Sequence, residues 1–124
     1  MTTSSNIERE MAVLFADVSG STRLYEILGD TRAFAAVNDS LNLLRRVTAA
    51  HGGRVVKTIG DEIMAVFPNA VAAVQAACEM QAEVTAQPAV EKNIRIAIRI
   101  GFHCGSVLEN QKDGDVFGDN VNIA

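Results

Sequence analysis

The sequence lacks the features that mark several common classes of protein. No apolar run approaches the roughly 20 residues that a membrane-spanning helix needs. Residues 1–10 contain neither a basic region nor an apolar stretch, and so do not resemble a secretory signal peptide. The net charge is −4 and there is no basic tract, which argues against a nucleic-acid partner or an anionic membrane surface.

Cysteine is also scarce. Cys78 and Cys104 lie far apart, without the C-x-x-C spacing of a redox or metal motif, so we expect two buried and chemically inert thiols. These features fit a reducing cytoplasm. Repeats, linkers and low-complexity segments are missing as well. The 124 residues therefore predict one domain, over residues 8–124, preceded by a short extension at residues 1–7.

Hydrophobic periodicity predicts eight elements in the order β-α-α-β-β-α-β-β. The first three elements are a strand over 10–16, a short helix ending at Gly29, and a longer helix capped by Asp30 or Thr31 and ending at 51–53. Two strands follow, over 54–58 and 62–67, joined by a hairpin at 59–61. The last three elements are a helix opened by Pro68 and Asn69 and ending at 87–88, a strand over 94–103 and, after a turn at 105–106, a short strand at 107–108. This order predicts an α+β fold of the ferredoxin-like type, an antiparallel sheet with helices packed on one face.

Two acidic turns follow strongly apolar strands. Asp17 comes directly after the first strand, and Asp61 lies in the hairpin between the second and third. In a ferredoxin-like sheet these two turns can meet at one edge. Two carboxylates about 4 Å apart repel by about 4 kcal/mol at an effective dielectric near 20. A hard divalent cation removes this cost, and Mg²⁺ commonly joins one or two carboxylates to substrate phosphates. The alternative is that both aspartates only form turns.

Other polar residues near these turns extend the candidate site. The backbone carbonyl of Val18 is a further candidate metal ligand, whereas we expect Glu62 to lie on the surface because it faces away from Asp61 along the strand. Lys57 interrupts an apolar strand, either as a donor to a base or phosphate or as an edge-strand charge. A carboxylate such as Asp115 can accept from an exocyclic amine, and Asn122 can hydrogen-bond a ribose.

The strand over 94–103 has one polar face. Arg95 and Arg99 alternate with apolar residues along it, which indicates either a dimer interface or a surface that binds phosphates.

Three stretches resemble the class III adenylate/guanylate cyclase catalytic domain. They are residues 15–22 (FADVSGST), 57–61 (KTIGD) and 115–124 (DVFGDNVNIA), which occur in the family's order. The resemblance covers residues 8–124 and implies a ferredoxin-like core that works as a head-to-tail homodimer with active sites at the interface.

The resemblance also implies roles for single residues. Asp17 and Asp61 resemble the pair that holds two Mg²⁺ or Mn²⁺ ions. Lys57 and Asp115 resemble the purine-selecting pair of an adenylate cyclase, and Asn122 resembles the asparagine that orients the ribose. The implied reaction converts ATP to 3′,5′-cyclic AMP and pyrophosphate in cyclic nucleotide signalling.

Two departures from the family pattern keep alternatives open. Ser21 stands where many relatives carry phenylalanine. The family's transition-state arginine would follow Asn122 by four residues, beyond Ala124, so the resemblance implies a domain that is incomplete at its carboxyl end. The alternatives are a catalytically silent dimerisation or regulatory domain, a guanylate cyclase, or a diguanylate cyclase, whose G-G-D-E-F turn is echoed at residues 60–62.

Overall fold

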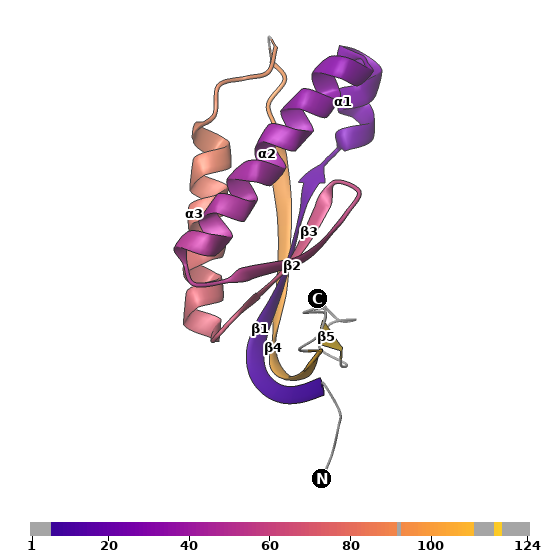
Figure 1. The fold of residues 1–124 in the computed structure, drawn as a ribbon. Helices are drawn as coiled ribbons and strands as arrows, with labels where there is room; N and C mark the ends of the chain where they lie inside the picture. The colour runs from indigo at the N-terminus through magenta and orange to yellow at the C-terminus, as the bar shows by residue number, and fades with distance from the viewer. Residues whose placement is uncertain (1–5, 92, 111–115, 118–124) are drawn as a thin grey trace.

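The computed structural model describes residues 6–91, 93–110 and 116–117 and folds into one antiparallel sheet with three helices (Figure 1). The strands lie in the order β2-β3-β1-β4-β5. The elements are β1 (Asn6–Ser19), α1 (Ser21–Leu28), α2 (Asp30–Ala50), β2 (Arg54–Ile59), β3 (Glu62–Phe67), α3 (Ala70–Ala86), β4 (Ala97–Asn110) and β5 (Val116–Phe117). The predicted α+β class is confirmed, and so is the order of the first seven elements, whereas the last strand lies at Val116–Phe117 rather than at 107–108.

The sheet carries a different apolar cluster on each face. Because side chains alternate along a strand, Leu14 and Ala16 of β1 pack against the helices, whereas Met11 and Val13 point to the opposite face. The helix-side cluster is the larger one and forms the main core, which α2 and α3 cover from one side (Figure 1). Below, the other side of the sheet is called the open face.

The helices begin and end largely where predicted, with one correction. The side chain of Asn69 accepts a hydrogen bond of 2.8 Å from the backbone N–H of Ala72 and so caps α3, as expected. Neither Asp30 nor Thr31 caps α2; its N-cap is Gly29, which makes no side-chain hydrogen bond.

Burial in the helices depends on how they approach the sheet, and the prediction of two buried cysteines is wrong. Phe34 is 61% exposed on α2, and on α3 the buried stripe is Ala73, Ala76, Met80 and Val84, because these small or flexible side chains let the helix approach the sheet. Cys78 and Cys104 are both exposed. Cys78 lies off the buried stripe of α3, and Cys104, which pairs with Ala12 of the helix-side core, is exposed on that face of β4.

The predicted turn at residues 105–106 is also wrong. β4 pairs with β1 without a break from Ala97↔Ser19 to Asn110↔Asn6, so the segment at 107–108 continues the same strand. The long partner strand keeps the ladder intact through Gly105. Within the described part of the chain, no helix has both the length and the apolar character needed to cross a membrane.

Candidate functional site

The Asp61 turn adjoins the end of β1, and Asp17 lies within β1 rather than directly after it as predicted. The backbone N–H of Val18 donates a 3.2 Å hydrogen bond to the carbonyl of Asp61, and Asp17 lies directly opposite Glu62 in the β1–β3 ladder. The hairpin turn is only two residues long, and Gly60 has a φ of 59°, which a two-residue turn between twisted strands favours. The backbones of Asp17 and Asp61 are therefore neighbours, as the predicted topology suggested.

Asp17 belongs to the open face. Its neighbours Ala16 and Val18 pack into the helix-side core, so its own side chain points the other way. Asp61, in the turn, lines a cavity of about 510 Å³ on the helix side, together with α2 residues such as Leu41 and Arg45. Its charge also acts on Glu62, so Asp61 influences both sides of the hairpin.

Glu62 is a member of this cluster that the sequence analysis placed on the surface. Its side chain is half-buried and stands opposite Asp17. Burial raises the pKa of the Glu62 carboxyl, and the negative charges of Asp17 and Asp61 raise it further, while Arg99 acts in the opposite direction. The signal that identifies Glu62 is the cross-strand register, which requires the strand pairing to be known.

Arg99 of β4 supplies the positive charge of the cluster. Its guanidinium makes a bidentate contact with Asp17, in which Nη2 lies 3.1 Å from Oδ2 and Nε lies 3.3 Å from Oδ1. The contact follows from the register, because Arg99 lies directly opposite Asp17 in the β1–β4 ladder.

A β-bulge between Val55 and Lys57 decides where Lys57 points. Val55 pairs with Ala65 and packs into the helix-side core, and regular alternation would place Lys57 on that same face. The bulge inserts Val56, so Lys57 pairs with Met64 of the open-face cluster instead. Lys57 therefore stands on the same face of the sheet as Asp17 and Glu62.

Two predicted site residues, Asp115 and Asn122, lie outside the described residues. The short strand β5, which follows Asp115 in sequence, pairs with Leu108 and Glu109 of β4. It forms the edge of the sheet opposite β2.

The residues at the strand end suit a hard divalent cation. Asp17, Asp61 and Glu62 provide carboxylate oxygens, and the charges of Asp17 and Asp61 add to the burial that raises the pKa of Glu62, a repulsion that a cation would relieve. Among the residues whose placement is described, no three His, Cys, Asp or Glu side chains already converge as a ready-made ligand set.

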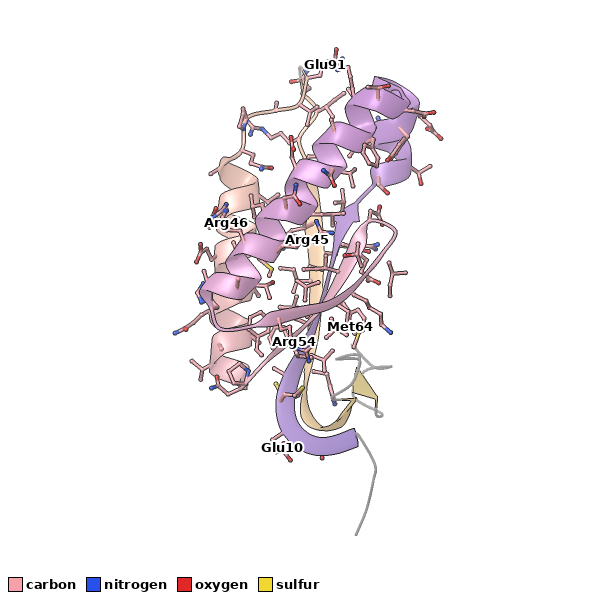
Figure 2. The ribbon with its side chains drawn as sticks, in the orientation of Figure 1. Glu10, Arg45, Arg46, Arg54, Met64 and Glu91 are labelled. Atoms are coloured by element: carbon pink, nitrogen blue, oxygen red, sulfur yellow. The ribbon has the colours of Figure 1, made fainter. Side chains whose placement is uncertain are left out.

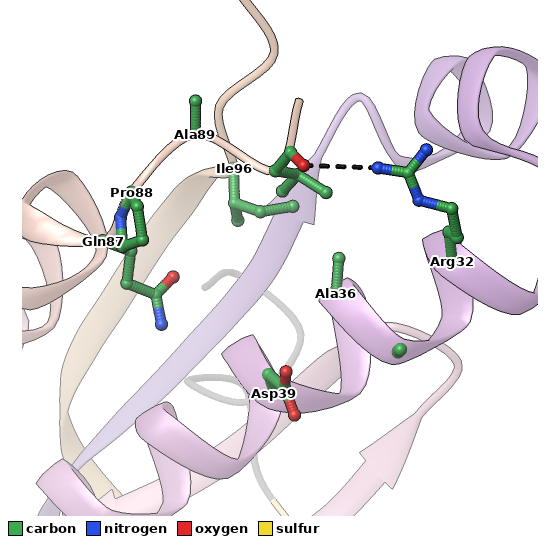
Figure 3. A pocket seen from close by; sticks show the side chains of 9 residues that line it. Arg32, Ala36, Asp39, Gln87, Pro88, Ala89 and Ile96 are labelled. Carbon is green, nitrogen blue, oxygen red and sulfur yellow. Dashed lines mark hydrogen bonds between the residues drawn. The ribbon is translucent and has the colours of Figure 1, made fainter. Parts of the chain in front are cut away.

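A second cavity, of about 400 Å³, lies between α2 and the segment that follows α3 (Figure 3). Arg32, one of its two charged lining residues, contacts the carbonyl of Val90 and the carboxylate of Glu91, each at 3.4 Å. None of the predicted site residues lines this cavity.

Comparison with known sequences identifies the family. Residues 4–124 match the model of the adenylate and guanylate cyclase catalytic domain. The chain is 34% identical over 135 residues to an adenylate cyclase of Anabaena cylindrica, covering 94% of this chain and 26% of that protein. It is 32% identical over 118 residues to an adenylate cyclase of Streptomyces coelicolor, covering 95% and 29%. The chain thus spans less than a third of the length of these relatives.

Solved structures agree with this match. A bacterial light-regulated adenylyl cyclase superposes with a TM-score of 0.84 at 26% identity, over 98% of this chain and 40% of that one. An adenylate/guanylate cyclase/hydrolase from Silicibacter pomeroyi superposes with a TM-score of 0.74 at 34% identity, over 96% and 69%. The fold, the adjoining acidic turns and the sequence match lead to one conclusion: this chain belongs to the adenylate and guanylate cyclase catalytic domain family.

Proposed function

We propose that this chain is the catalytic domain of an adenylate cyclase, which converts ATP to 3′,5′-cyclic AMP and pyrophosphate in the cytoplasm for cyclic nucleotide signalling. The observation that carries the proposal is the 3.2 Å hydrogen bond that holds the Asp61 turn against the strand end bearing Asp17. The relatives described as adenylate cyclases, at 34% and 32% identity, favour ATP as the substrate.

Asp17 and Asp61, with the backbone carbonyl of Val18, would hold two Mg²⁺ or Mn²⁺ ions. When bound, these ions lower the pKa of the ribose 3′-hydroxyl and neutralise charge on the phosphates. The rigid strand end fixes Asp17, because Ala16 and Val18 on either side of it are buried at 0% and 3% exposure. A fixed ligand position is what an in-line displacement needs.

The remaining residues would select and orient the nucleotide. Lys57 donates to a ring nitrogen of adenine, Asp115 accepts from its exocyclic amine, and Asn122 orients the ribose. The 3′-oxygen then attacks the α-phosphorus, the bond to the bridging oxygen of the β-phosphate breaks, and pyrophosphate leaves. The proton of the 3′-hydroxyl passes to water.

In this proposal the active site is completed by a second copy of the chain. One subunit supplies Asp17 and Asp61, and its partner supplies Lys57, Asp115 and Asn122, as the family resemblance implies. Activity then depends on protein concentration, because a dissociated chain has no complete site.

Complementation tests the shared site directly. Asp17→Ala and Lys57→Ala variants, each carried by the full-length domain, are assayed for cyclic nucleotide alone and mixed, with ATP and GTP compared side by side. Each variant alone is expected to be inactive. The mixture is expected to recover about a quarter of the wild-type activity, because half of the random dimers are mixed and each has one intact site.

Three results would change the conclusion. No recovery in the mixture contradicts the shared site. A preference for GTP makes the protein a guanylate cyclase. No cyclic nucleotide from the wild-type domain at any protein concentration makes it a silent, regulatory member of the family.

A further inference from the structure

Three charged side chains form a row across three neighbouring strands on the open face. Asp17 of β1 is paired directly with Glu62 of β3 on one side and with Arg99 of β4 on the other. Directly paired residues point to the same face of an antiparallel sheet, so the three side chains lie next to one another. We call these residues the charged row. In this row the candidate metal ligand Asp17 has the guanidinium of Arg99 on one side and the carboxylate of Glu62 on the other.

Arg99 occupies the atoms of Asp17 that a metal ion would use. Its Nη2 and Nε lie 3.1 Å and 3.3 Å from the two different carboxylate oxygens. A carboxylate that is bound in this bidentate way has both oxygens engaged. A cation can take Asp17 as a ligand only when at least one of these contacts is given up.

Arg99 is able to move away at little cost. Its side chain is 74% exposed, whereas that of Asp17 is 23% exposed. An exposed ion pair contributes little to stability, and a divalent cation can exceed it. The aspartate is fixed by the buried strand around it, so the arginine is the partner that changes position.

We propose that Arg99 is a positioning residue that guards Asp17: it neutralises and orients this carboxylate while no metal is bound, and it competes with the metal for it. The inference rests on the proposed role of Asp17 as a metal ligand. The guard prevents Asp17 and Glu62 from facing each other as two unpaired negative charges. It also makes the affinity for metal in the absence of nucleotide lower than the carboxylates alone would give.

Mn²⁺ binding to the nucleotide-free chain tests the proposal without an activity assay. Binding is measured from the electron paramagnetic resonance signal of free Mn²⁺, for the wild type and for Arg99→Gln, Arg99→Lys and Arg95→Gln. Arg99→Gln is expected to bind Mn²⁺ up to about five-fold more tightly, the factor that corresponds to a surface ion pair. Arg99→Lys keeps the charge but loses the bidentate contact, and we expect a smaller gain.

Arg95→Gln is the matched control. It removes the same charge from another exposed arginine of the same segment, whose Nη1 donates to the carbonyl of Gln87 at 3.0 Å rather than to Asp17. It is expected to change Mn²⁺ affinity by less than about two-fold, since a distant exposed charge is screened. Thermal unfolding confirms that each variant is folded.

The outcomes separate this inference from the function on which it rests. Unchanged or weaker Mn²⁺ binding in Arg99→Gln overturns the guard, and so does an equal gain in Arg95→Gln. Asp17→Asn should abolish the tight Mn²⁺ site. If Asp17→Asn abolishes the site but Arg99→Gln has no effect, the guard alone fails. If Asp17→Asn leaves Mn²⁺ binding intact, Asp17 is not a metal ligand and the proposed function fails with it.

Discussion

Two charged regions of this molecule are built in opposite ways. Between α2 and α3, each acid meets a base: His51 Nε2 lies 2.6 Å from Glu79 Oε1, and Arg46 Nη2 lies 2.7 Å from Glu83 Oε1. At the end of β1, the guanidinium of Arg99 pairs with Asp17, and the charges of Asp17 and Asp61 both act on Glu62. Figure 2 shows Arg46 on the α3 side of α2, far from the hairpin.

The two regions shift acid pKa values in opposite directions. The hydrogen bond from Arg46 is the largest cause that lowers the pKa of Glu83, so the folded state favours its charged form. Burial and neighbouring carboxylates raise the pKa of Glu62, so the folded state disfavours its charged form. Matched charges between the helices support the fold. The excess of negative charge at the strand end works against the fold and is what we expect of a site kept for a cation.

The largest expected effect is on activity. Asp17→Asn is expected to lower cyclic AMP formation by at least about 10²-fold, the order of loss when one key electrostatic group is removed from a transition state. The melting temperature should change little, because the Arg99 contact is an exposed ion pair. Cyclic nucleotide assay and thermal unfolding of the same full-length preparation check both. A large fall in stability would show that Asp17 supports the fold instead.

The next largest effect is on stability, through the packing of Gly53 against the main core. A methyl group at Gly53 would lie 2.5–2.9 Å from atoms of the Phe67 ring, which is buried in the main core. Gly53→Ala is therefore expected to lower the free energy of unfolding by about 1–3 kcal/mol, the usual cost of overpacking. Urea denaturation measures it. Gly60→Ala is a useful contrast, because it meets no atom within 4 Å and is strained only through its φ of 59°. Equal stability of Gly53→Ala and the wild type would contradict the packing.

A smaller effect is expected from Glu83→Gln between the helices. Because the pKa of Glu83 is lowered in the folded state, its charged form adds stability above the ordinary pKa of about 4.5, and this stability is lost as the pH falls through the folded-state value. The variant should melt slightly below the wild type at pH 7, and the two should converge in acid. Glu10→Gln, a change at an exposed carboxyl on β1, is the control. A gap that persists below the folded-state pKa would rule out ionisation as the cause.

The smallest effect is expected from Glu62→Gln, which should raise stability where Glu83→Gln lowers it and so tests the contrast between the two regions directly. The pKa of Glu62 is raised in the folded state, so its contribution to stability is present below pH 4.5 and is lost as the pH rises through the folded-state value. In metal-free buffer at pH 7, Glu62→Gln should therefore melt at a slightly higher temperature than the wild type. The corresponding gain in the free energy of unfolding is about 0.5 kcal/mol or less. Melting curves from pH 3 to pH 8 check the sign. If Glu62→Gln and Glu83→Gln shift in the same direction, the contrast between the two regions is wrong.

Much of the fold is predictable from local sequence. The Pro68–Asn69 helix start and the glycine turn at Gly60 use short-range preferences, and both are confirmed. The first strand is confirmed too, but it continues past its predicted end at residue 16 to Ser19, so Asp17 lies within it. Local sequence is less informative about which side chains are buried. Phe34 and Val71 are large apolar residues of α2 and α3, yet both are exposed.

For the candidate site, too, local sequence predicts some features and strand pairing decides the others. The sequence by itself determined that an apolar run leads into Asp17, that Asp61 lies in a turn and that a lysine precedes this turn, because apolar runs and turns depend on neighbouring residues. Only the tertiary structure decided which side chains meet. The register across three strands sets Glu62, Asp17 and Arg99 in one row, and a single inserted residue, Val56, turns Lys57 to their face. Register and bulges depend on the partner strand, so no periodicity within one segment specifies them.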